Sequence, residues 1–428
     1  MGPKGLEIIG NDAYLNGYKL ESLVKQYTTP LYVMDEKSIR SAIEDYQTYF
    51  KGNYFKSSII YASKAFLVPK LVEIINEYHL YMDAVSIGDL YVALQSNFPP
   101  QHLVFHGNNK SFEELNFAID NKIGLIVVDN YHELQQLIAI CEAKKTTQNI
   151  LFRLNPGINA HTHKYIQTAK YTSKFGESMY DEKIIDKIMN TIKASPCMHL
   201  KGFHAHIGSQ IHEFGAFRAE INKMVKFQEK ISTKYQYDLP ILNLGGGFGI
   251  QYEHHEKNMS IKDMMMHISQ RLDEVLKENN RIQEIMIEPG RSIVGPAGIT
   301  LYTCSQIKKT YGGTNYLFVD GGMTDNIRPA LYNATYECDI VNKMQEKKDI
   351  LVDVVGKCCE SGDIIRKNVY VPHIDNGDIM MVYATGAYNY SMSSNYNNLL
   401  KPAVILVGEE ITVMSKKEQL SDLLRLFK

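Results

Sequence analysis

Eight short apolar runs, separated mostly by amphipathic stretches of helix length, constrain the fold of this chain more than any other feature. The runs lie near residues 57–62, 80–85, 102–106, 123–128, 150–155, 200–206, 240–244 and 284–288. The helix-length stretches include 111–120, 131–143, 181–193, 217–233 and 261–277. Eight strands that alternate with helices over about 250 residues are typical of a (β/α)8 barrel. We therefore predict a closed TIM-type barrel, with an open doubly wound sheet as the alternative.

The pattern changes after about residue 292. Runs at 301–309, 314–319, 349–354, 378–383 and 403–407 have the composition of strands, with no helices of similar length between them. This pattern predicts a mostly antiparallel β domain. We expect an N-terminal segment over 1–35 that pairs with the β domain, a barrel over 36–293, and the C-terminal β domain over 294–428.

The composition favours a globular protein in a reducing compartment. The chain has 428 residues, a formal net charge of -2 and 44% hydrophobic residues. The scattered charges give no reason to expect a nucleic acid or a membrane surface as partner. No apolar run approaches the length of a membrane span, and the first residues lack the apolar core of a signal peptide. The six cysteines include no CxxC pair, so we expect no metal site, no disulfide framework and a cytoplasmic location.

Polar residues gather at the carboxyl ends of the predicted barrel strands, where barrels of this kind carry their chemistry. Seven of the eight strands end in ionisable residues or glycines. In chain order these are Lys64; Asp83 and Ser86; His106; Arg153 and Asn155; His206 with Gly208, Ser209 and Gln210; Gly245 to Gly249; and Glu288 with Arg291. Because these ends meet at one rim of a barrel, the sequence predicts a single polar site there.

Lys64 follows the apolar run Ile59–Ala62, directly before a helix pattern. A lysine at the end of a buried strand is a candidate for imine formation, since partial burial favours the neutral amine that attacks a carbonyl. The alternative is a strand-end lysine whose ammonium group reaches water. The residues around Lys64 alone favour this alternative.

A glycine run follows the seventh predicted strand, and Glu288 follows the eighth. Successive glycines let backbone N–H groups approach an anion, and barrels often bind phosphate at these two strand ends. A lysine for an imine and a phosphate site together suggest pyridoxal phosphate, whose ring nitrogen Glu288 could keep protonated. The alternatives are a flexible turn for the glycines and an ion pair with Arg291 for Glu288. His206 could stack on the cofactor ring or be a structural histidine.

Six motifs in this order resemble the fold-type III pyridoxal-phosphate decarboxylases. They are Tyr61-Ala-Ser-Lys-Ala65, His206-Ile-Gly-Ser-Gln210, Gly245-Gly-Gly247, Glu288-Pro-Gly-Arg291, Cys359-Glu-Ser-Gly-Asp363 and Gly386-Ala-Tyr388. Within this family the chain most resembles the diaminopimelate decarboxylases, from Thr29 to about Val407. The segments 106–111, 161–163 and 173–176 are also similar to the family, whereas Ile87 stands where the family usually has a glycine.

The resemblance implies a pyridoxal 5'-phosphate cofactor held by the barrel. It implies that Lys64 bonds covalently to the cofactor, that Glu288 pairs with the ring nitrogen, and that His206 stacks on the ring. The other implied cofactor-binding residues are Asp83, Ser209, Gly245, Gly246, Gly247, Pro289, Gly290, Arg291 and Tyr388. Cys359 is implied as a further catalytic residue, the proton donor after carbon dioxide leaves.

The resemblance also implies a substrate site in the β domain. The implied substrate-binding residues are Arg291, Arg328, Tyr332, Glu360 and Tyr388. Ornithine-type decarboxylases carry an aspartate at the position of Glu360 and bind only a distal amine. Arg328 adds a positive charge suited to a distal carboxylate, so a substrate with a second amino-acid head group fits better.

The activity that the resemblance implies is decarboxylation of meso-2,6-diaminopimelate to L-lysine and carbon dioxide, the last step of lysine biosynthesis. The alternatives are a decarboxylase of ornithine, arginine or carboxynorspermidine, and a non-catalytic regulator that binds the cofactor. A regulator would be expected to lack Lys64 or Cys359, and both are present. A homodimer with shared active sites is implied as well, because in such enzymes the Cys359–Glu360 segment reaches the other subunit.

Overall fold

The computed structural model describes residues 2–158, 173–278 and 281–427, which form two compact units. The barrel unit contains Ile43–Gly249 and Asn258–Gly290, and the β unit contains Met1–Ala42, Ile250–Lys257 and Arg291–Lys428. The sequence-based domain limits at 36 and 294 stay predictions. The family-like segment His161–His163 lies outside the described residues.

The barrel unit is built on eight parallel strands that close into a ring. In spatial order these are β5 (Lys56–Tyr61), β6 (Tyr81–Ala84), β7 (Leu103–Phe105), β8 (Leu125–Val128), β9 (Gln148–Asn155), β11 (Met198–His204), β12 (Ile241–Asn243) and β13 (Glu284–Ile287). The pairing of β13 with β5 closes the ring, and the short β10 (Glu177–Ser178) adds to β9 alone. The prediction of a closed barrel is therefore confirmed, and the open doubly wound alternative is wrong.

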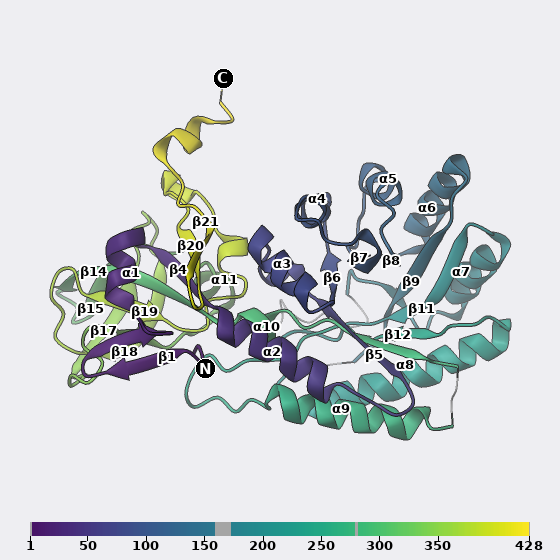
Figure 1. The fold of residues 1–428 in the computed structure, drawn as a ribbon, viewed down its shortest axis with the longest axis horizontal. Coiled ribbons are helices and arrows are strands. Elements are labelled where there is room, and N and C mark those ends of the chain that lie inside the picture. Colours follow the sequence, from purple (N-terminus) through teal and green to yellow (C-terminus); the bar gives the residue numbers. More distant parts are fainter. Residues whose placement is uncertain (1, 159–172, 279–280, 428) are drawn as a thin grey trace. The chain divides into compact units, whose positions relative to one another are not determined.

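Helices follow most of the barrel strands (Figure 1). They are α3 (Pro69–Glu77), α4 (Ile87–Gln95), α5 (Phe112–Asp120), α6 (Tyr131–Lys144), α7 (Glu182–Ala194), α8 (Phe214–Tyr235) and α9 (Ile261–Leu276), and α2 (Glu36–Tyr49) precedes the first strand. The start of α5 shows why they begin where they do. Ser111 and Glu114 form a reciprocal capping box, which satisfies N–H groups that the first helical turn leaves unpaired.

Apolar side chains fill the inside of the barrel. Ile60, Val104, Val127, Leu151 and Met286 form one buried cluster, with Leu125 at its edge. Side chains alternate between the two faces of a strand, so the residues that follow the apolar positions can reach the carboxyl-end rim. The packed interior therefore supports the polar rim without offering a pore through the barrel.

The β unit contains a mostly antiparallel nine-stranded sheet. Its strands are β4 (Leu31–Asp35), β14 (Gly298–Lys309), β15 (Asn315–Val319), β16 (Cys338–Ile340), β17 (Ile350–Val355), β18 (Ile364–Val371), β19 (Ile379–Val382), β20 (Ala403–Val407) and β21 (Ile411–Ser415). The strand β4 pairs antiparallel with β14 and parallel with β20, so residues near the N-terminus lie inside this sheet. The sequence patterns did not predict β16, β18 or β21.

Smaller elements complete the β unit. A separate small sheet contains β1 (Leu6–Ile9), β2 (Asp12–Leu15) and β3 (Tyr18–Lys19). The helices are α1 (Leu20–Tyr27), α10 (Arg291–Val294) and α11 (Arg328–Tyr332), and the single-turn helices η4 (Tyr390–Met392), η5 (Tyr396–Asn398) and η6 (Leu420–Leu424) lie near the C-terminus.

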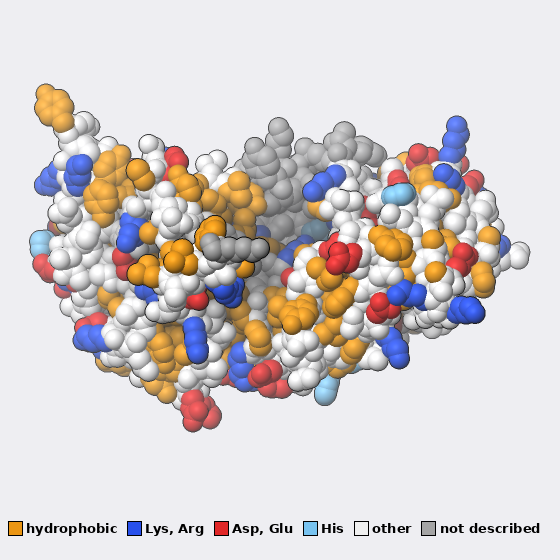
Figure 2. Space-filling model, turned by 90° about the horizontal axis from the view of Figure 1, so that it is seen from above, with side chains coloured by type: hydrophobic (Ala, Val, Ile, Leu, Met, Phe, Trp, Pro, Cys, Tyr) orange, Lys and Arg blue, Asp and Glu red, His pale blue; other side chains and the backbone are white. Residues whose placement is uncertain are grey.

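The surface is mixed in charge. On the face drawn in Figure 2, the basic and acidic side chains are interspersed, in keeping with the net charge of -2. Within the described residues, no helix combines the length and the apolar character needed to cross a membrane.

Gly202 lies in β11 where the register with β9 shifts. A substitution at this residue tests how closely β11 approaches its other neighbour, β12. A Cβ atom at Gly202 would lie 1.6 Å from the carbonyl oxygen of Ile241 in β12. We expect Gly202→Ala to lower the free energy of unfolding by about 3 kcal/mol or more, because backbone has to move to relieve the clash. Denaturant unfolding followed by circular dichroism measures this change.

Gly215 is the matched control. It lies in the first turn of α8, and a Cβ atom there has no neighbour within 4 Å. Gly215→Ala should change stability by no more than about 1 kcal/mol, in the stabilising direction. Equal unfolding midpoints for the two variants would contradict the described approach of β11 to β12.

Candidate active site

Lys64 lies in the single-turn helix η1 (Ser63–Ala65), directly after β5. Its neighbours Ser63 and Ala65 are buried, whereas Lys64 itself is exposed. The partial burial expected for a reactive lysine is therefore not seen, and burial alone does not activate this amine. The turn that carries Lys64 is held to β6, because the backbone N–H of Ser63 donates to Asp83 Oδ1 at 2.6 Å.

Asp83 ends up buried at the carboxyl end of β6, with 2% of its surface exposed. Burial raises the pKa of this carboxyl group to about 6, against the opposing effects of the charges on His106 and Lys64. The group thus holds the lysine turn through a hydrogen bond while titrating well above an ordinary aspartate.

Glu288, directly after β13, is a buried carboxylate with three side-chain partners. Its Oε1 lies 2.9 Å from His106 Nε2 and accepts a hydrogen bond from Asn243 Nδ2 at 2.8 Å. Its Oε2 lies 3.3 Å from His204 Nε2. Burial tends to raise the pKa of Glu288, but the two imidazoles outweigh it and hold the pKa well below its usual range. The carboxylate is therefore ionised at neutral pH.

The glycine turn is tied to the same group of residues. The N–H of Gly245 donates to Asn243 Oδ1 at 2.8 Å, and the N–H of Gly246 donates to His206 Nδ1 at 3.2 Å. Two of the three glycine N–H groups thus have protein partners, which the sequence could not predict. Burial, followed by the charges of Lys64 and Arg153, keeps the pKa of His206 well below its usual range, so its ring is neutral.

The segment after Glu288 joins the two ends of the barrel sheet. The N–H of Ala62 donates to the carbonyl oxygen of Pro289 at 2.9 Å. A Cβ atom at Gly290 would lie 2.7 Å from the Cβ of Ala62, so only glycine fits this approach. The structure thereby brings the strand ends at Lys64 and Glu288 to neighbouring positions on one rim.

His204 and Asn243 were not predicted as site residues, although both contact Glu288. Each is a polar residue at the end of an otherwise apolar strand, in Gly-Phe-His204-Ala and Ile-Leu-Asn243-Leu. Buried polar residues are uncommon and are paired when they occur. That contrast was the available signal.

The β unit has its own cluster, made of two arginines and four tyrosines. Arg291 Nη1 donates to the hydroxyl of Tyr252 at 2.6 Å, and Arg328 Nε donates to the hydroxyl of Tyr336 at 2.7 Å. The guanidinium of Arg291 lies 4.6 Å from the ring centre of Tyr388, and that of Arg328 lies 5.7 Å from it. The fourth tyrosine, Tyr332, has its ring centre 5.3 Å from the guanidinium of Arg328. Tyr252 and Tyr336 were not predicted, because nothing marks them among 28 tyrosines.

Arg328 is a buried cation without a carboxylate partner. Only 7% of its surface is exposed, and no carboxylate of the described residues lies within ion-pair distance of it. Burial tends to lower its pKa, but the tyrosine hydroxyls outweigh this and raise it, so the guanidinium stays charged. Because an uncompensated buried charge is costly, the arrangement is suited to an anionic ligand.

Tyr388 has an unusual backbone conformation for an aromatic residue. Its φ of 59° lies in the left-handed region, which bulky residues seldom adopt. Such strain persists where the surrounding structure holds it, and it is concentrated at functional sites. Its contacts with the two guanidinium groups therefore belong to a fixed arrangement.

The predicted thiol lies on an exposed turn. Buried Asp363 accepts hydrogen bonds from the N–H groups of Cys358 and Met323, at 2.7 and 2.6 Å. This turn buries Cys358 but leaves Cys359 and Glu360 exposed. Cys359 is thus placed to meet groups from outside its own turn.

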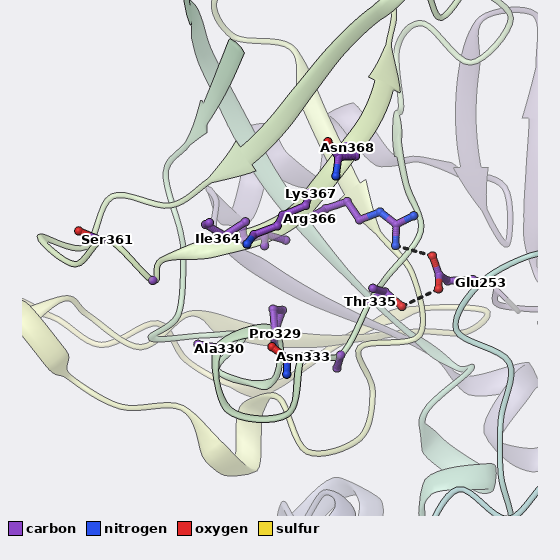
Figure 3. A pocket seen from close by; sticks show the side chains of 13 residues that line it. Glu253, Pro329, Ala330, Asn333, Thr335, Ser361, Ile364, Arg366, Lys367 and Asn368 are labelled. Atoms are coloured by element: carbon purple, nitrogen blue, oxygen red, sulfur yellow. Dashed lines mark hydrogen bonds and ion pairs between the residues drawn. The ribbon is translucent and has the colours of Figure 1, made fainter. Parts of the chain in front are cut away.

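A cavity of about 640 Å³ lies between α11 and β18 in the β unit (Figure 3). One wall contains the ion pair of Arg366 Nη1 with Glu253 Oε1, at 2.5 Å, and the hydroxyl of Thr335 donates to Glu253 Oε2 at 2.6 Å. Its lining residues, all within the described part of the β unit, do not include Arg328 or Cys359. The size of this cavity therefore does not identify it as the site of chemistry.

The raised pKa of Asp83 predicts a pH-dependent stability. An unfolded aspartate loses its proton near pH 3.8, whereas the folded carboxyl keeps it until about pH 6. Stability from this group is therefore fully present below pH 3.8 and is lost as the pH rises to 6. The shift corresponds to about 3 kcal/mol. We expect the wild-type protein, freed of small ligands, to lose about this much relative to Asp83→Asn across that range. Denaturant unfolding at several pH values measures the difference.

Asp83→Ala is the matched comparison. Asparagine retains an oxygen that can accept from Ser63, whereas alanine leaves this N–H unpaired. The alanine variant should be less stable than the asparagine variant by about 1–3 kcal/mol at every pH. A constant difference between wild type and Asp83→Asn would show that burial does not set this titration.

Comparisons with known proteins identify the family of the chain. The model of the pyridoxal-dependent decarboxylase family, pyridoxal binding domain, matches residues 36–295. The diaminopimelate decarboxylase of Bacillus subtilis is 40% identical over 430 residues, covering 98% of this chain and 94% of that protein. That of Staphylococcus aureus is 39% identical over 397 residues, covering 92% of each chain.

Solved structures of diaminopimelate decarboxylases have the same fold. Diaminopimelate decarboxylase from M. jannaschii, in complex with L-lysine, has a TM-score of 0.93 at 29% identity, covering 100% of this chain and 98% of that one. The Helicobacter pylori enzyme, also with L-lysine, has a TM-score of 0.86 at 31% identity, covering 95% and 98%. A lysine/ornithine decarboxylase from Vibrio vulnificus, at 21% identity and a TM-score of 0.77, shares the fold alone. The chain therefore belongs to the diaminopimelate decarboxylase family of pyridoxal-phosphate-dependent decarboxylases.

Proposed function

We propose that this protein decarboxylates meso-2,6-diaminopimelate to L-lysine and carbon dioxide, the last step of lysine biosynthesis. The observation that carries the choice of substrate is the buried, uncompensated charge of Arg328. Diaminopimelate keeps a second carboxylate at its far end during the reaction, and ornithine has none. A fixed guanidinium is the group best suited to bind such a carboxylate.

The barrel residues fit the cofactor that the family requires. A Cβ atom at Gly246 would lie 2.0 Å from the carbonyl oxygen of Glu288, and one at Gly247 would lie 2.2 Å from that of Gly208. These positions therefore admit only glycine, which lets a phosphate approach the backbone closely, although the N–H groups of Gly245 and Gly246 already have protein partners. Glu288 supplies an ionised carboxylate for a ring nitrogen. When bound, pyridoxal phosphate withdraws electrons from the carbon that loses its carboxylate.

Each barrel residue is given one task in this scheme. Lys64, exposed on its turn, would hold the cofactor covalently through its amine. Glu288 would keep the ring nitrogen protonated, and the neutral ring of His206 would pack against the cofactor ring. Ser209, Gly245, Gly246 and Gly247 bind the phosphate, while Asp83, Pro289 and Gly290 hold the positions of these groups.

The β unit recognises the substrate. Arg328 binds the distal carboxylate, with Tyr332 beside it, and Glu360 binds the distal amino group. Arg291 and Tyr388 bind both the cofactor and the substrate. Their side chains contact each other, with the guanidinium of Arg291 4.6 Å from the ring centre of Tyr388. Cys359 then gives a proton to the carbon from which carbon dioxide has left.

We also propose a homodimer with shared active sites. The exposure of both Cys359 and Glu360 supports this, because a turn that serves its own unit alone would be expected to bury its reactive groups. A second subunit would exclude water from the thiol and place it at the reacting carbon. A cytoplasmic location is in keeping with six free cysteines, all within the described chain.

The rival activities differ in what they require of Arg328. Decarboxylation of ornithine or carboxynorspermidine leaves no distal carboxylate to pair with it. A non-catalytic regulator has no need of Lys64 and Cys359, and the chain retains both.

Arg328→Ala provides the test of substrate choice. We expect wild-type enzyme to release carbon dioxide faster from meso-diaminopimelate than from ornithine, arginine or carboxynorspermidine. Arg328→Ala should raise KM for diaminopimelate by about 50-fold, since a hydrogen bond to a charged group contributes about 2–3 kcal/mol. Initial rates of carbon dioxide release measure both quantities.

Lys367→Ala is the matched control for the loss of one positive charge in the β unit. Lys367 is exposed and lines the cavity of Figure 3. Its removal should leave KM unchanged. Faster turnover of ornithine by the wild type, or an equal rise in KM in both variants, would refute the assigned substrate role of Arg328.

Mixing two inactive variants tests the shared sites. Lys64→Ala and Cys359→Ser should each be nearly inactive, and Lys64→Ala should also lose the visible absorbance of lysine-bound cofactor. If Cys359 serves the partner's Lys64, mixed dimers contain one intact site and regain activity. The measurement is the rate after the two variants are mixed and allowed to exchange subunits.

A matched mixture distinguishes exchange from contamination. Lys64→Ala mixed with a Lys64→Ala, Cys359→Ser double variant contains no intact site in any pairing. Activity only in the first mixture is expected. No recovery despite subunit exchange, shown by mass-tagged chains, would mean that each site is complete within one chain.

A further inference from the structure

Three side chains from three different strands surround the carboxylate of Glu288. They are His106 after β7, His204 at the end of β11 and Asn243 at the end of β12. Their contacts with the carboxylate are 2.9, 3.3 and 2.8 Å. All four residues are buried, with 6%, 1%, 0% and, for Glu288, 9% of their surface exposed. Such convergence on one carboxylate implies a task for the set.

We propose that His106, His204 and Asn243 are positioning residues that keep Glu288 ionised and aimed at the ring nitrogen of the cofactor. The inference rests on the proposed function, since it takes Glu288 as the partner of that nitrogen. It adds three residues to which the cofactor scheme gave no role. They act through Glu288 rather than by touching the substrate.

The charge of the side chains that donate to Glu288 decides whether the carboxylate keeps its attraction for a protonated ring nitrogen. Burial lowers the pKa of His204 to about 4, although the charge of Glu288 opposes the shift. His204 is therefore neutral at pH 7 and donates a hydrogen bond without cancelling the negative charge. Asn243 is neutral by nature. A lysine or arginine in their place would neutralise the carboxylate and weaken its attraction for a protonated ring nitrogen.

The number of contacts also limits how the carboxylate can bind. An ionised carboxylate has about four lone-pair sites for hydrogen bonds. The hydrogen bonds of His204 and Asn243 occupy two of them, and His106 Nε2 lies 2.9 Å from Oε1, so few directions are left for a further donor. A carboxylate fixed in this way is preorganised, so little free energy is lost in orienting it when the ring nitrogen arrives.

Asn243 has a second contact that links the two ends of the cofactor site. Its Nδ2 donates to Glu288, while its Oδ1 accepts from the N–H of Gly245 at 2.8 Å. The backbone adds a parallel link, because the N–H of Glu288 donates to the carbonyl oxygen of Gly245 at 2.7 Å. The distance from the carboxylate to the glycine turn is therefore fixed by one side chain and one backbone bond. This distance has to match the span from ring nitrogen to phosphate.

A buried ion pair anchors the turn that follows His106. Lys110 Nζ donates to the carbonyl oxygens of Gly107 and Val127, at 2.7 and 2.9 Å, and lies 2.8 Å from Glu133 Oε1. Both charged side chains are almost fully buried. The turn after β7 is thus anchored, which restricts where the imidazole of His106 can go.

A metal ion is the competing use of the same atoms. The ligand atoms of His106, His204 and Glu288 all lie within 4.8 Å of one another, a spacing that a divalent ion can bridge. The two uses exclude each other, because an ion on the carboxylate blocks the ring nitrogen. They are separable by experiment.

A double-mutant cycle on cofactor affinity tests the proposal. Apoprotein of the wild type, His204→Leu, Glu288→Gln and the double variant is titrated with pyridoxal phosphate, followed by absorbance without substrate. His204→Leu should weaken binding about tenfold when Glu288 is present, and by less than about twofold when it is glutamine. His204→Gln, which retains a neutral donor, should restore most of the affinity.

Two outcomes of these measurements would refute the positioning role of His204. If His204→Leu weakens binding equally in both backgrounds, His204 has a merely structural effect and the proposal is wrong. If zinc at one equivalent per chain survives addition of the cofactor, measured by mass spectrometry, the carboxylate serves a metal and the proposal is also wrong. Should the leucine variant not fold, by circular dichroism, Asn243→Ala takes its place in the same cycle.

An error in the proposed substrate would not affect these titrations, because they are carried out without substrate. A protein that binds pyridoxal phosphate with the expected coupling but acts on ornithine would refute the proposed substrate and leave the shell around Glu288 intact. A wild-type protein that fails to bind the cofactor would overturn both.

Discussion

The pairing of the last barrel strand with the first is the constraint on which the site depends. β13 runs parallel to β5, with Ile287 opposite Ile59. Residues more than 200 positions apart in sequence thereby become neighbours. The bond from Ala62 to Pro289 and the close packing of Gly290 continue this pairing past the ends of the strands. Without closure, the turn of Lys64 and the carboxylate of Glu288 would have no fixed relation.

Closure of the barrel also explains why buried polar groups at this rim do not destabilise the fold. The interior beneath it is apolar and buried, so the strand ends do not need to be flexible to reach water. Several buried polar groups there have hydrogen-bond partners, since the N–H of Ser63 donates to Asp83 and the N–H of Gly245 donates to Asn243. Satisfied in this way, the groups are rigid, and rigidity is what a binding site for a planar cofactor needs.

Much of the fold was predictable because the barrel strands are buried on both faces and so form continuous apolar runs. All eight were found at their predicted places. The sequence failed where this logic does not hold. β18 alternates buried, partly exposed and exposed residues, among them Arg366, Lys367 and Asn368, so its apolar pattern is too weak to identify a strand. In β16, the charged Asp339 separates Cys338 from Ile340, so the strand forms no continuous apolar run.

The site was predictable only in part, for a related reason. Lys64 and Glu288 stand at strand ends on one predicted rim with other polar residues, and this shared rim suggests a role for both. His204 and Asn243 also end apolar strands, but their partner Glu288 lies 84 and 45 residues away, and the local sequence does not indicate which residue they contact. Nothing in the sequence marks Tyr252 and Tyr336 among the other tyrosines. The exposure of Lys64 likewise depends on the turn that carries it, because Ser63 and Ala65 take the buried positions on either side.

The two units use the same physical device for opposite charges. In the barrel unit, the neutral imidazole of His204 and the amide of Asn243 contact a carboxylate, and in the β unit, a guanidinium donates to a neutral phenol. Ion pairs would fix the same side chains, as Arg366 and Glu253 fix each other, but they would also consume the charge. Neutral partners offset part of the cost of burial and leave the full charge for a ligand. Glu288 is therefore matched to a positive ring nitrogen and Arg328 to a negative carboxylate, which is the pair of charges that an amino-acid decarboxylase acting on a dicarboxylic substrate has to bind.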